Sequence, residues 1–146
     1  MQEGGNLRER FSSRCAAFGV TLRAMTSGPG FTKRPEHRVA VRPAGVRVRI
    51  VARGEVVADT LDALRMEETN HQPVYYVPRK DVRMERLARS QHRSHCPFKG
   101  EASYFSLAGG AENAAWSYED PYDEVSVIRD LLAFYPDKVD AIEAAL

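Results

Sequence analysis

Alternation of apolar and charged residues with a period of two is the feature that most limits how this chain can fold. In "VRVRIVARGEVVADT" (residues 46–60), Val48 and Ile50 point to one side of an extended chain while the intervening arginines point to the other. A turn at Gly54 and Glu55 interrupts the pattern, and a second apolar run follows it. This arrangement predicts an antiparallel hairpin with one buried face.

Similar patterns recur along the chain. Residues 64–67 alternate again, and the short strand "VYYV" (74–77) ends at Pro78. "ASYFSL" (102–107) and "AAWSY" (114–118) flank the turn "AGGAEN" and predict the clearest hairpin. Short helical segments are expected within 78–87, 119–132 and 137–146, and a basic loop around 88–101. The chain is therefore predicted to be a mostly β, small antiparallel domain with a few short helices.

The chain of 146 residues is long enough for one domain with a real core and a modest extension. Residues 1–36 mix arginine, serine and small residues and contain the break Gly28-Pro29-Gly30. We expect these residues to be a flexible extension or a mis-assigned start, since Met25 is a plausible natural start that would leave residues 1–24 outside the protein. The β domain is expected over residues 37–146.

Composition argues against several classes of partner. The formal net charge is +1, which provides no electrostatic reason to expect nucleic acid or an anionic membrane as the partner. No apolar run approaches the length needed to cross a bilayer. The two cysteines, Cys15 and Cys96, do not suggest a disulfide framework, so a reducing, cytoplasmic location is expected.

Aromatic residues are concentrated in the second half, where ten of the thirteen lie from Tyr75 onward. If the hairpin pairs residue 107 with residue 114, Phe105 lies opposite Trp116, and Ser103 lies opposite Tyr118 on the same face. Tyr104 then belongs to the other face. Such a face builds a hydrophobic core or lines a pocket, and both interpretations stay open at this point.

The segment "SHCPFKG" (94–100) carries the most reactive groups. Cys96 is a candidate nucleophile if a neighbour such as His95 or Lys99 favours its thiolate. The alternative is an inert, buried thiol, which is the commoner role of a free cysteine. We favour the inert thiol.

A metal site at His92, His95 and Cys96 would need one or two further ligands. The only other histidines are His37 and His71, and nothing in the sequence places either of them nearby. Neither a metal nor another cofactor is expected.

Cations close to aromatic residues indicate a ligand-binding site rather than a metal site. Arg65, Glu67, Arg79 and Lys99 would be unusual companions of the tyrosines if their strands converged. Cations beside aromatic faces suit a ligand with a planar and an anionic part. The alternative is a surface network of ion pairs.

Four blocks, "YYVPRKDVRME", "HCPFKGEASYF", "AAWSYEDPYDE" and "AFYPDKVD", occur in an order and spacing that resemble the DUF427 family, a domain of unknown function. The resemblance extends from about Val46 to Asp140. The family's cysteine-proline-aromatic-lysine-glycine block corresponds to residues 96–100, with Phe98 where members usually carry tryptophan or tyrosine. Its alanine-tryptophan-x-tyrosine block corresponds to residues 115–118.

The resemblance implies a β-tent (Mss4-like) fold, some relatives of which bind small molecules in an aromatic cage. Others hold zinc through two Cys-x-x-Cys pairs, which are absent here, so no structural zinc is implied. The family has also been labelled nucleotidyltransferase-like. That activity uses a Gly-Ser turn followed by an Asp-x-Asp pair, whereas Asp59 and Asp62 are three apart and follow no such turn.

These observations lead to one leading hypothesis, which is a single domain that binds an unknown small molecule. The predicted ligand-binding residues are Tyr75, Arg79, Lys99, Tyr104, Trp116 and Tyr118. Pro97 and Gly100 are expected to form a turn that directs Phe98 to the core and Lys99 elsewhere. The alternatives are a group-transfer enzyme using Cys96 or Lys99, and an interaction module that forms a homodimer through a strand edge.

Overall fold

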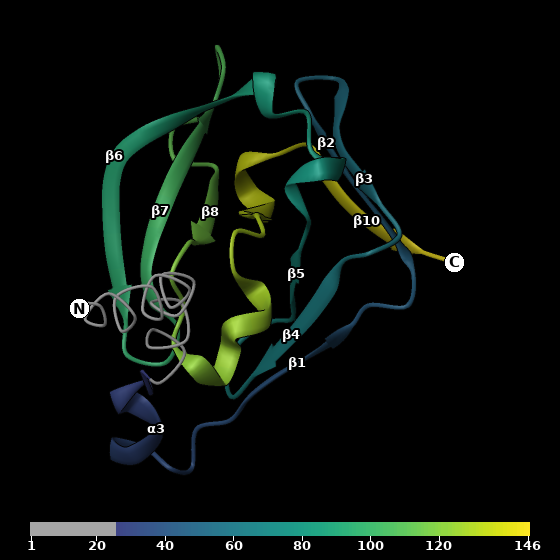
Figure 1. Ribbon diagram of the computed structural model, residues 1–146. Helices are drawn as coiled ribbons and strands as arrows, with labels where there is room; N and C mark the ends of the chain where they lie inside the picture. Colours follow the sequence, from purple (N-terminus) through teal and green to yellow (C-terminus); the bar gives the residue numbers. More distant parts are fainter. Residues whose placement is uncertain (1–25) are drawn as a thin grey trace, which may run out of the picture.

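The computed structural model describes residues 26–146, which form ten strands in three antiparallel sheets (Figure 1). This arrangement confirms the predicted mostly β class. The strands are β1 (Val39–Pro43), β2 (Arg47–Ala52), β3 (Glu55–Thr60), β4 (Leu64–Glu68), β5 (Val74–Tyr76), β6 (Leu87–Cys96), β7 (Gly100–Leu107), β8 (Ala115–Tyr118), β9 (Ala133–Phe134) and β10 (Ala141–Ala145). The helical segments are α3 (Pro29–Lys33) and the 3₁₀ turns Arg79–Asp81, Met84–Arg86, Asp123–Ile128 and Pro136–Lys138.

The predicted hairpin of residues 46–60 forms β2 and β3. Its turn lies at Arg53 and Gly54, one residue earlier than expected, and both residues have positive φ angles, 54° and 77°. Two consecutive positive φ angles match the twist of a tight two-residue hairpin. Val48 and Ile50 are buried on the inner face, as the alternation predicted.

The predicted closing helix within 137–146 is wrong for residues 141–145, which form β10. This strand pairs antiparallel with β2, placing Ile142 opposite Ile50 and Ala144 opposite Val48. Without β10, β2 would be an open sheet edge with unpaired backbone groups. Pairing across 90 residues of sequence therefore outweighs the local helix preference of a segment rich in alanine.

The second sheet has the strand order β1-β4-β5. β4 follows the predicted alternation and buries Met66. Val39 pairs with Glu68, and Leu64 pairs with Tyr76. The end of β4 therefore lies beside the start of β1, and the tyrosines of β5 lie along the other side of β4.

The third sheet has the order β6-β7-β8-β9. β6 occupies residues that were predicted to be a basic loop. It is the outer strand and most of its side chains are exposed, so its sequence lacks the apolar alternation that identifies a strand. Its pairing with β7 is irregular between Arg89 and Arg93, and the strand curves around β7 in Figure 1.

The hairpin of β7 and β8 differs from the predicted register by one residue. Tyr104 lies opposite Trp116, and Phe105 lies opposite Ala115. The connecting loop folds on itself, because Leu107 N–H donates to the carbonyl of Ala111 at 2.9 Å, and this shifts β8 along β7. The predicted pair of Phe105 and Trp116 is therefore wrong, and Tyr104 shares a face with Trp116.

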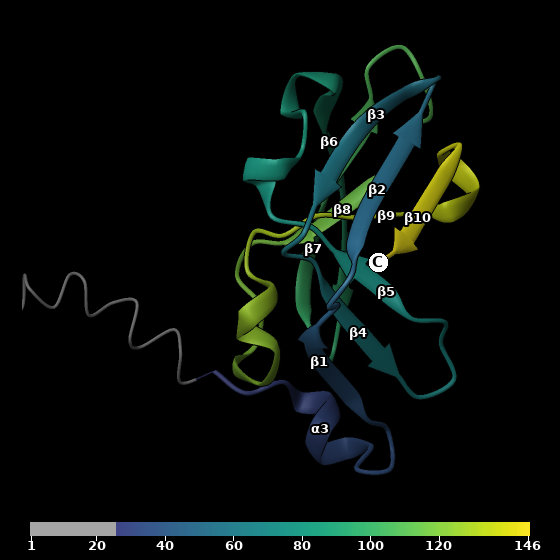
Figure 2. The same cartoon turned by 90° about the vertical axis from the view of Figure 1, so that its right-hand side faces the viewer.

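Residues 26–36 of the expected extension pack against the β domain. Gly30 N–H donates to the carbonyl of Pro97 at 2.9 Å, and Phe31 meets Phe98 edge to face. Glu124 accepts hydrogen bonds from the Ser27 hydroxyl at 2.5 Å and from a backbone N–H. Figure 2 shows α3 beside the start of β1. The expectations for residues 1–24 lie outside the described residues.

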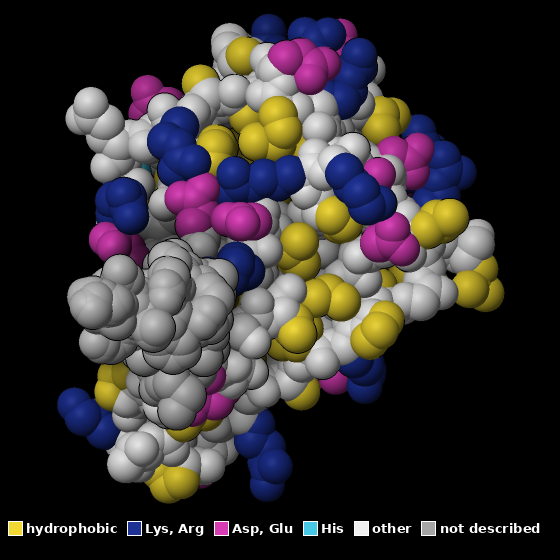
Figure 3. All heavy atoms as spheres, in the orientation of Figure 1, with side chains coloured by type: hydrophobic (Ala, Val, Ile, Leu, Met, Phe, Trp, Pro, Cys, Tyr) yellow, Lys and Arg dark blue, Asp and Glu magenta, His cyan; other side chains and the backbone are white. Residues whose placement is uncertain are grey.

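Within residues 26–146 no helix is long and apolar enough to cross a membrane. On the face shown in Figure 3, acidic and basic side chains alternate and hydrophobic side chains gather between them.

Candidate functional site

A cavity of about 640 Å³ lies where the three sheets meet. It is large enough for a small organic ligand. Its walls come from β4, β5 and the loop between them, from β7, β8 and β9, and from β2 and β10. The lining residues are Ile50, Glu68, His71, Gln72, Pro73, Val74, Tyr75, Tyr76, Lys99, Tyr104, Trp116, Tyr118, Phe134, Tyr135, Pro136 and Ile142.

The lining brings together five of the six predicted ligand-binding residues, although they come from separate strands and turns. The five are Tyr75, Lys99, Tyr104, Trp116 and Tyr118. Tyr104 takes part because of the corrected register, which places it directly across from Trp116. The sixth residue, Arg79, is not part of this lining.

Trp116 is the aromatic centre of the cavity. It is half-buried, and its indole N–H donates to the Tyr76 hydroxyl at 3.3 Å. Its ring lies 4.4 Å from the Tyr135 ring, centroid to centroid, at an angle of 42°. Tyr104 is held in turn by Ser94, with 2.7 Å between the two hydroxyl oxygens. The surrounding tyrosines thus fix the orientation of the indole and leave part of its surface open.

Three of the cavity tyrosines, Tyr76, Tyr118 and Tyr135, stay protonated at neutral pH. Burial raises the pKa of Tyr76 and of Tyr118 well above the ordinary value. Burial and the neighbouring Tyr104 hydroxyl raise the pKa of Tyr135 to about 12. Protonated phenols can donate as well as accept hydrogen bonds, so they suit a polar ligand edge but not catalysis by a phenolate.

A second part of the cavity lining, the ionic end, contains Glu68, His71 and Lys99. Lys99 Nζ donates to Glu68 Oε1 at 2.6 Å, and the two side chains are only 12% and 9% exposed. The ring nitrogen Nε2 of His37 lies 2.7 Å from Glu68 Oε2. Burial raises the pKa of Glu68, but hydrogen bonds from Lys99 and His37 outweigh this effect and leave the pKa below its ordinary value. Glu68 is therefore a carboxylate at neutral pH.

A tight turn places Lys99 in this position. Lys99 N–H donates to the carbonyl of Cys96 at 3.3 Å, and Gly100 closes the turn with a φ of 111°. Phe98 points into the protein and is 7% exposed, stacked on the ring of His37 at 4.4 Å. The predicted division of this turn, with Phe98 in the core and Lys99 elsewhere, is confirmed.

Cys96, the other predicted catalytic candidate, ends β6 and is half-buried. It packs beside the cluster that contains Met66 and Tyr76 and does not line the cavity. The neighbouring His95 side chain is exposed and faces Tyr122, at 3.4 Å from ring nitrogen to hydroxyl. Cys96 thus packs behind the aromatic residues of the cavity, while Lys99 lines it.

Arg79 belongs to an ion-pair network outside the cavity. Its guanidinium donates to Glu119 at 2.8 Å and to the Ser117 hydroxyl at 3.0 Å. Glu119 also pairs with Arg89 at 2.8 Å. Hydrogen bonds from Arg89, Arg79 and Ser103 outweigh burial and lower the pKa of Glu119 to about 2. Arg79 thus occupies the surface network that was the alternative to a ligand contact.

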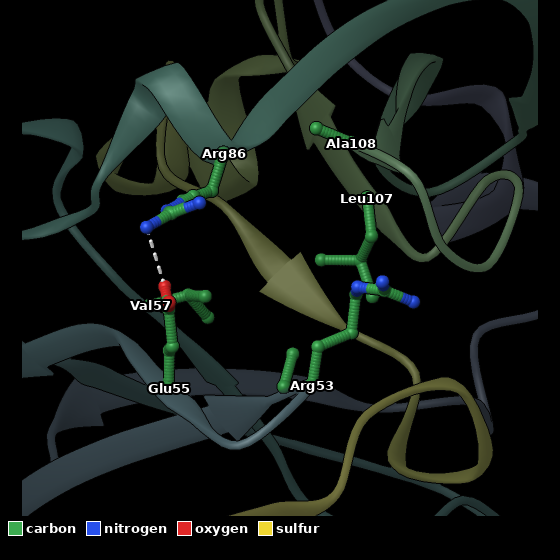
Figure 4. A pocket seen from close by; sticks show the side chains of 7 residues that line it. Arg53, Glu55, Val57, Arg86, Leu107 and Ala108 are labelled. Carbon is green, nitrogen blue, oxygen red and sulfur yellow. Dashed lines mark ion pairs between the residues drawn. The ribbon is translucent and has the colours of Figure 1, made fainter.

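A smaller cavity of about 260 Å³ lies near the β2–β3 turn (Figure 4). Arg53 lies on one side of it, and Arg86 forms an ion pair with Glu55 at 2.7 Å on the other. The remaining walls are aliphatic, from Val57, Leu107 and nearby alanines. No aromatic residue lines this cavity, so it is the weaker site.

Sequence reasoning missed several residues at the larger cavity. Tyr76 and Tyr135 lay within recognised aromatic blocks but had no distinguishing neighbour. Glu68, His37 and His71 became neighbours only through the pairing of β1 with β4 and the turn that follows β4. These three residues could have been recognised as neighbours only from a correct prediction of that strand pairing.

The fold and the cavity define a small antiparallel β domain with an aromatic, partly ionic pocket. Residues 40–145 match the family described as a domain of unknown function (DUF427). This match covers well over half of the chain, and the chain belongs to that family, as the resemblance indicated. A comparison with curated proteins gives no match. The β-tent label stays a prediction.

Proposed function

We propose that this domain binds a small molecule with a planar aromatic part and an anionic end. The proposal is based on one observation. A half-buried Trp116 and the ammonium group of Lys99 line the same cavity of about 640 Å³. An indole that served only the core would have no open cavity beside it.

The aromatic residues provide most of the binding surface. Trp116, Tyr75 and Tyr135 offer ring faces and edges to a planar ligand, and such contacts contribute about 0.5–1.5 kcal/mol each beyond the burial of apolar area. Because these rings are packed against neighbours, their ordering cost on binding is small. The protonated tyrosine hydroxyls add direction to polar groups of the ligand.

Lys99 provides the charge preference. An ammonium group has three N–H donors, and in the described part of the chain Glu68 accepts one of them, at 2.6 Å. The remaining donors are available to a carboxylate or phosphate in the cavity. An ammonium group that is ion-paired with a carboxylate in this way acts as a charge and a hydrogen-bond donor rather than as a nucleophile.

The proposal is tested by a thermal-shift panel on the untagged full-length chain. The panel compares aromatic carboxylates and nucleoside monophosphates with uncharged aromatic analogues and with citrate and inorganic phosphate. A compound present at 100 times its dissociation constant stabilises the native state by about 2.7 kcal/mol, which corresponds to a rise of about 8–10 °C for a domain of this size.

Two variants locate the binding. Trp116→Ala should remove the shift, whereas Tyr122→Ala, which removes an aromatic ring outside the cavity, should keep it. The proposal fails if planar anions shift the wild type no more than their uncharged analogues do, or if Trp116→Ala and Tyr122→Ala respond alike.

The two alternatives have less support. A group-transfer reaction would need Cys96, which does not line the cavity, or Lys99, which is ion-paired. Rapid alkylation of Cys96 near neutral pH, together with loss of ligand binding on alkylation, would favour that alternative. The predicted homodimer would be detected by light scattering at high protein concentration.

A further inference from the structure

His37, Glu68 and His71 lie together, and Glu68 and His71 line the ionic end of the cavity. One ring nitrogen from each histidine and one carboxylate oxygen lie within 4.8 Å of one another. The fold holds them there by backbone pairing, since His37 precedes β1, Glu68 ends β4, and His71 N–H donates to the carbonyl of Glu68 at 3.0 Å. The cluster therefore depends on a strand pair and a tight turn rather than on chance contacts of long side chains.

The three groups have the chemistry of a metal-binding site. Two imidazoles and one carboxylate are a donor set that zinc uses where it keeps a further position open. With bond lengths near 2.0–2.1 Å, two ligand atoms in a tetrahedral zinc site lie about 3.3 Å apart. Glu68 Oε2 lies 2.7 Å from Nε2 of His37 and 3.9 Å from Nε2 of His71, so the observed distances bracket that value.

Neighbouring residues orient the donors in the way that supports of metal ligands do. Lys99 holds Oε1 of Glu68, which leaves Oε2 facing the histidines. The His37 ring is stacked on Phe98, at an angle of 29° between the rings, and its side chain is 11% exposed. His71 is 57% exposed, so the third donor can adjust its position and solvent ions can reach the group.

We propose that His37, Glu68 and His71 bind one divalent metal ion of the zinc class at the end of the aromatic cavity. Because Glu68 and His71 line the cavity, an open coordination position of the ion is accessible from it. An anionic group of a cavity ligand would bind at that position beside Lys99. Metal binding itself does not depend on the ligand proposed above, and it is tested with zinc alone.

The competing interpretation is a hydrogen-bonded group without metal, in which His37 and Lys99 simply neutralise Glu68. The two interpretations differ in one measurable property, which is whether zinc affinity depends on both histidines. His92 and His95 provide a matched control, because they are exposed histidines on β6 outside the cluster.

The experiment uses the untagged full-length chain, stripped with EDTA and titrated with Zn²⁺ against a chromophoric chelator. We expect one equivalent to bind, with an affinity at least about 100-fold weaker in His37→Ala/His71→Ala and unchanged in His92→Ala/His95→Ala. His71→Ala alone, which removes an exposed side chain and should fold normally, should also bind zinc more weakly than the wild type. Circular dichroism and melting curves without metal verify folding of each variant.

Co²⁺ then reports the donor atoms. The expected spectrum lacks a thiolate charge-transfer band and changes when His71 is replaced. The proposal is overturned if the wild type and the His37/His71 double variant bind zinc equally, if the His92/His95 variant is the one that loses binding, or if a thiolate band assigns the ion to a cysteine.

Discussion

Replacing Lys99 by methionine leaves the Glu68 carboxylate with one partner fewer in a site where both side chains are about nine-tenths buried. Removing one member of a buried ion pair costs about 3–5 kcal/mol, because the remaining charge loses its compensation. The adjoining cavity admits water, so we expect the lower end, about 3 kcal/mol. For a domain of this size that cost corresponds to a fall of roughly 10 °C in melting temperature.

The assay is equilibrium unfolding in urea at neutral pH with EDTA present, for Lys99→Met, Glu68→Gln and the double variant. If the pair is coupled as the geometry indicates, the double variant should be at least about 2 kcal/mol more stable than the sum of the single effects predicts.

Lys80→Met is the matched control. Lys80 pairs with Asp62 and with Asp81, each at 2.9 Å, and its own side chain is about two-thirds exposed. The Lys80→Met substitution should lower the free energy of unfolding by no more than about 1 kcal/mol. A Lys99→Met cost equal to that of Lys80→Met, or strict additivity of the two changes at Lys99 and Glu68, would refute the reasoning.

Three further predictions concern stability. The pKa of Glu119 is lower in the folded than in the unfolded state, so its contribution to the free energy of unfolding is complete above about pH 4.5 and is lost as pH falls toward 2. In urea unfolding measured against pH, Glu119→Gln should therefore reduce the loss of stability on the acid side by about 1–2 kcal/mol. An unchanged profile would show that the pair with Arg89 is not coupled to folding. Gly100→Ala should cost about 1–2 kcal/mol, measured by urea unfolding, because φ is 111° there, and a neutral result would contradict that backbone geometry. Gly30→Ala places a Cβ 2.8 Å from the Phe98 ring, so it should increase proteolysis near residues 26–36, and no change would show that this contact does not hold the segment.

Local sequence pattern was sufficient for the strands with one buried and one exposed face. β2 and β4 were recognisable because Val48, Ile50 and Met66 alternate with charged residues. β6 was not, because an outer strand with exposed polar side chains has the composition of a loop. β10 was missed because its pairing with β2 is a long-range effect that no local preference encodes.

The aromatic part of the candidate site was predictable from residue type, whereas its ionic end was not. Trp116, Tyr118 and Lys99 lie in blocks that mix aromatic, cationic and turn-forming residues. His37 and Glu68 are 31 residues apart, and only the pairing of β1 with β4 brings them together. Prediction of the cavity as a whole therefore required the strand order.

The fluorescence of Trp116 tests the central claim most directly, because it is the only tryptophan in the chain and it lines the cavity. An aromatic anion that raises the melting temperature should change this fluorescence in a saturable manner, with one ligand bound per chain. Lys99→Met should raise the dissociation constant of that ligand. The account would be contradicted if stabilising compounds left the Trp116 emission unchanged, or if their affinity were the same in Lys99→Met.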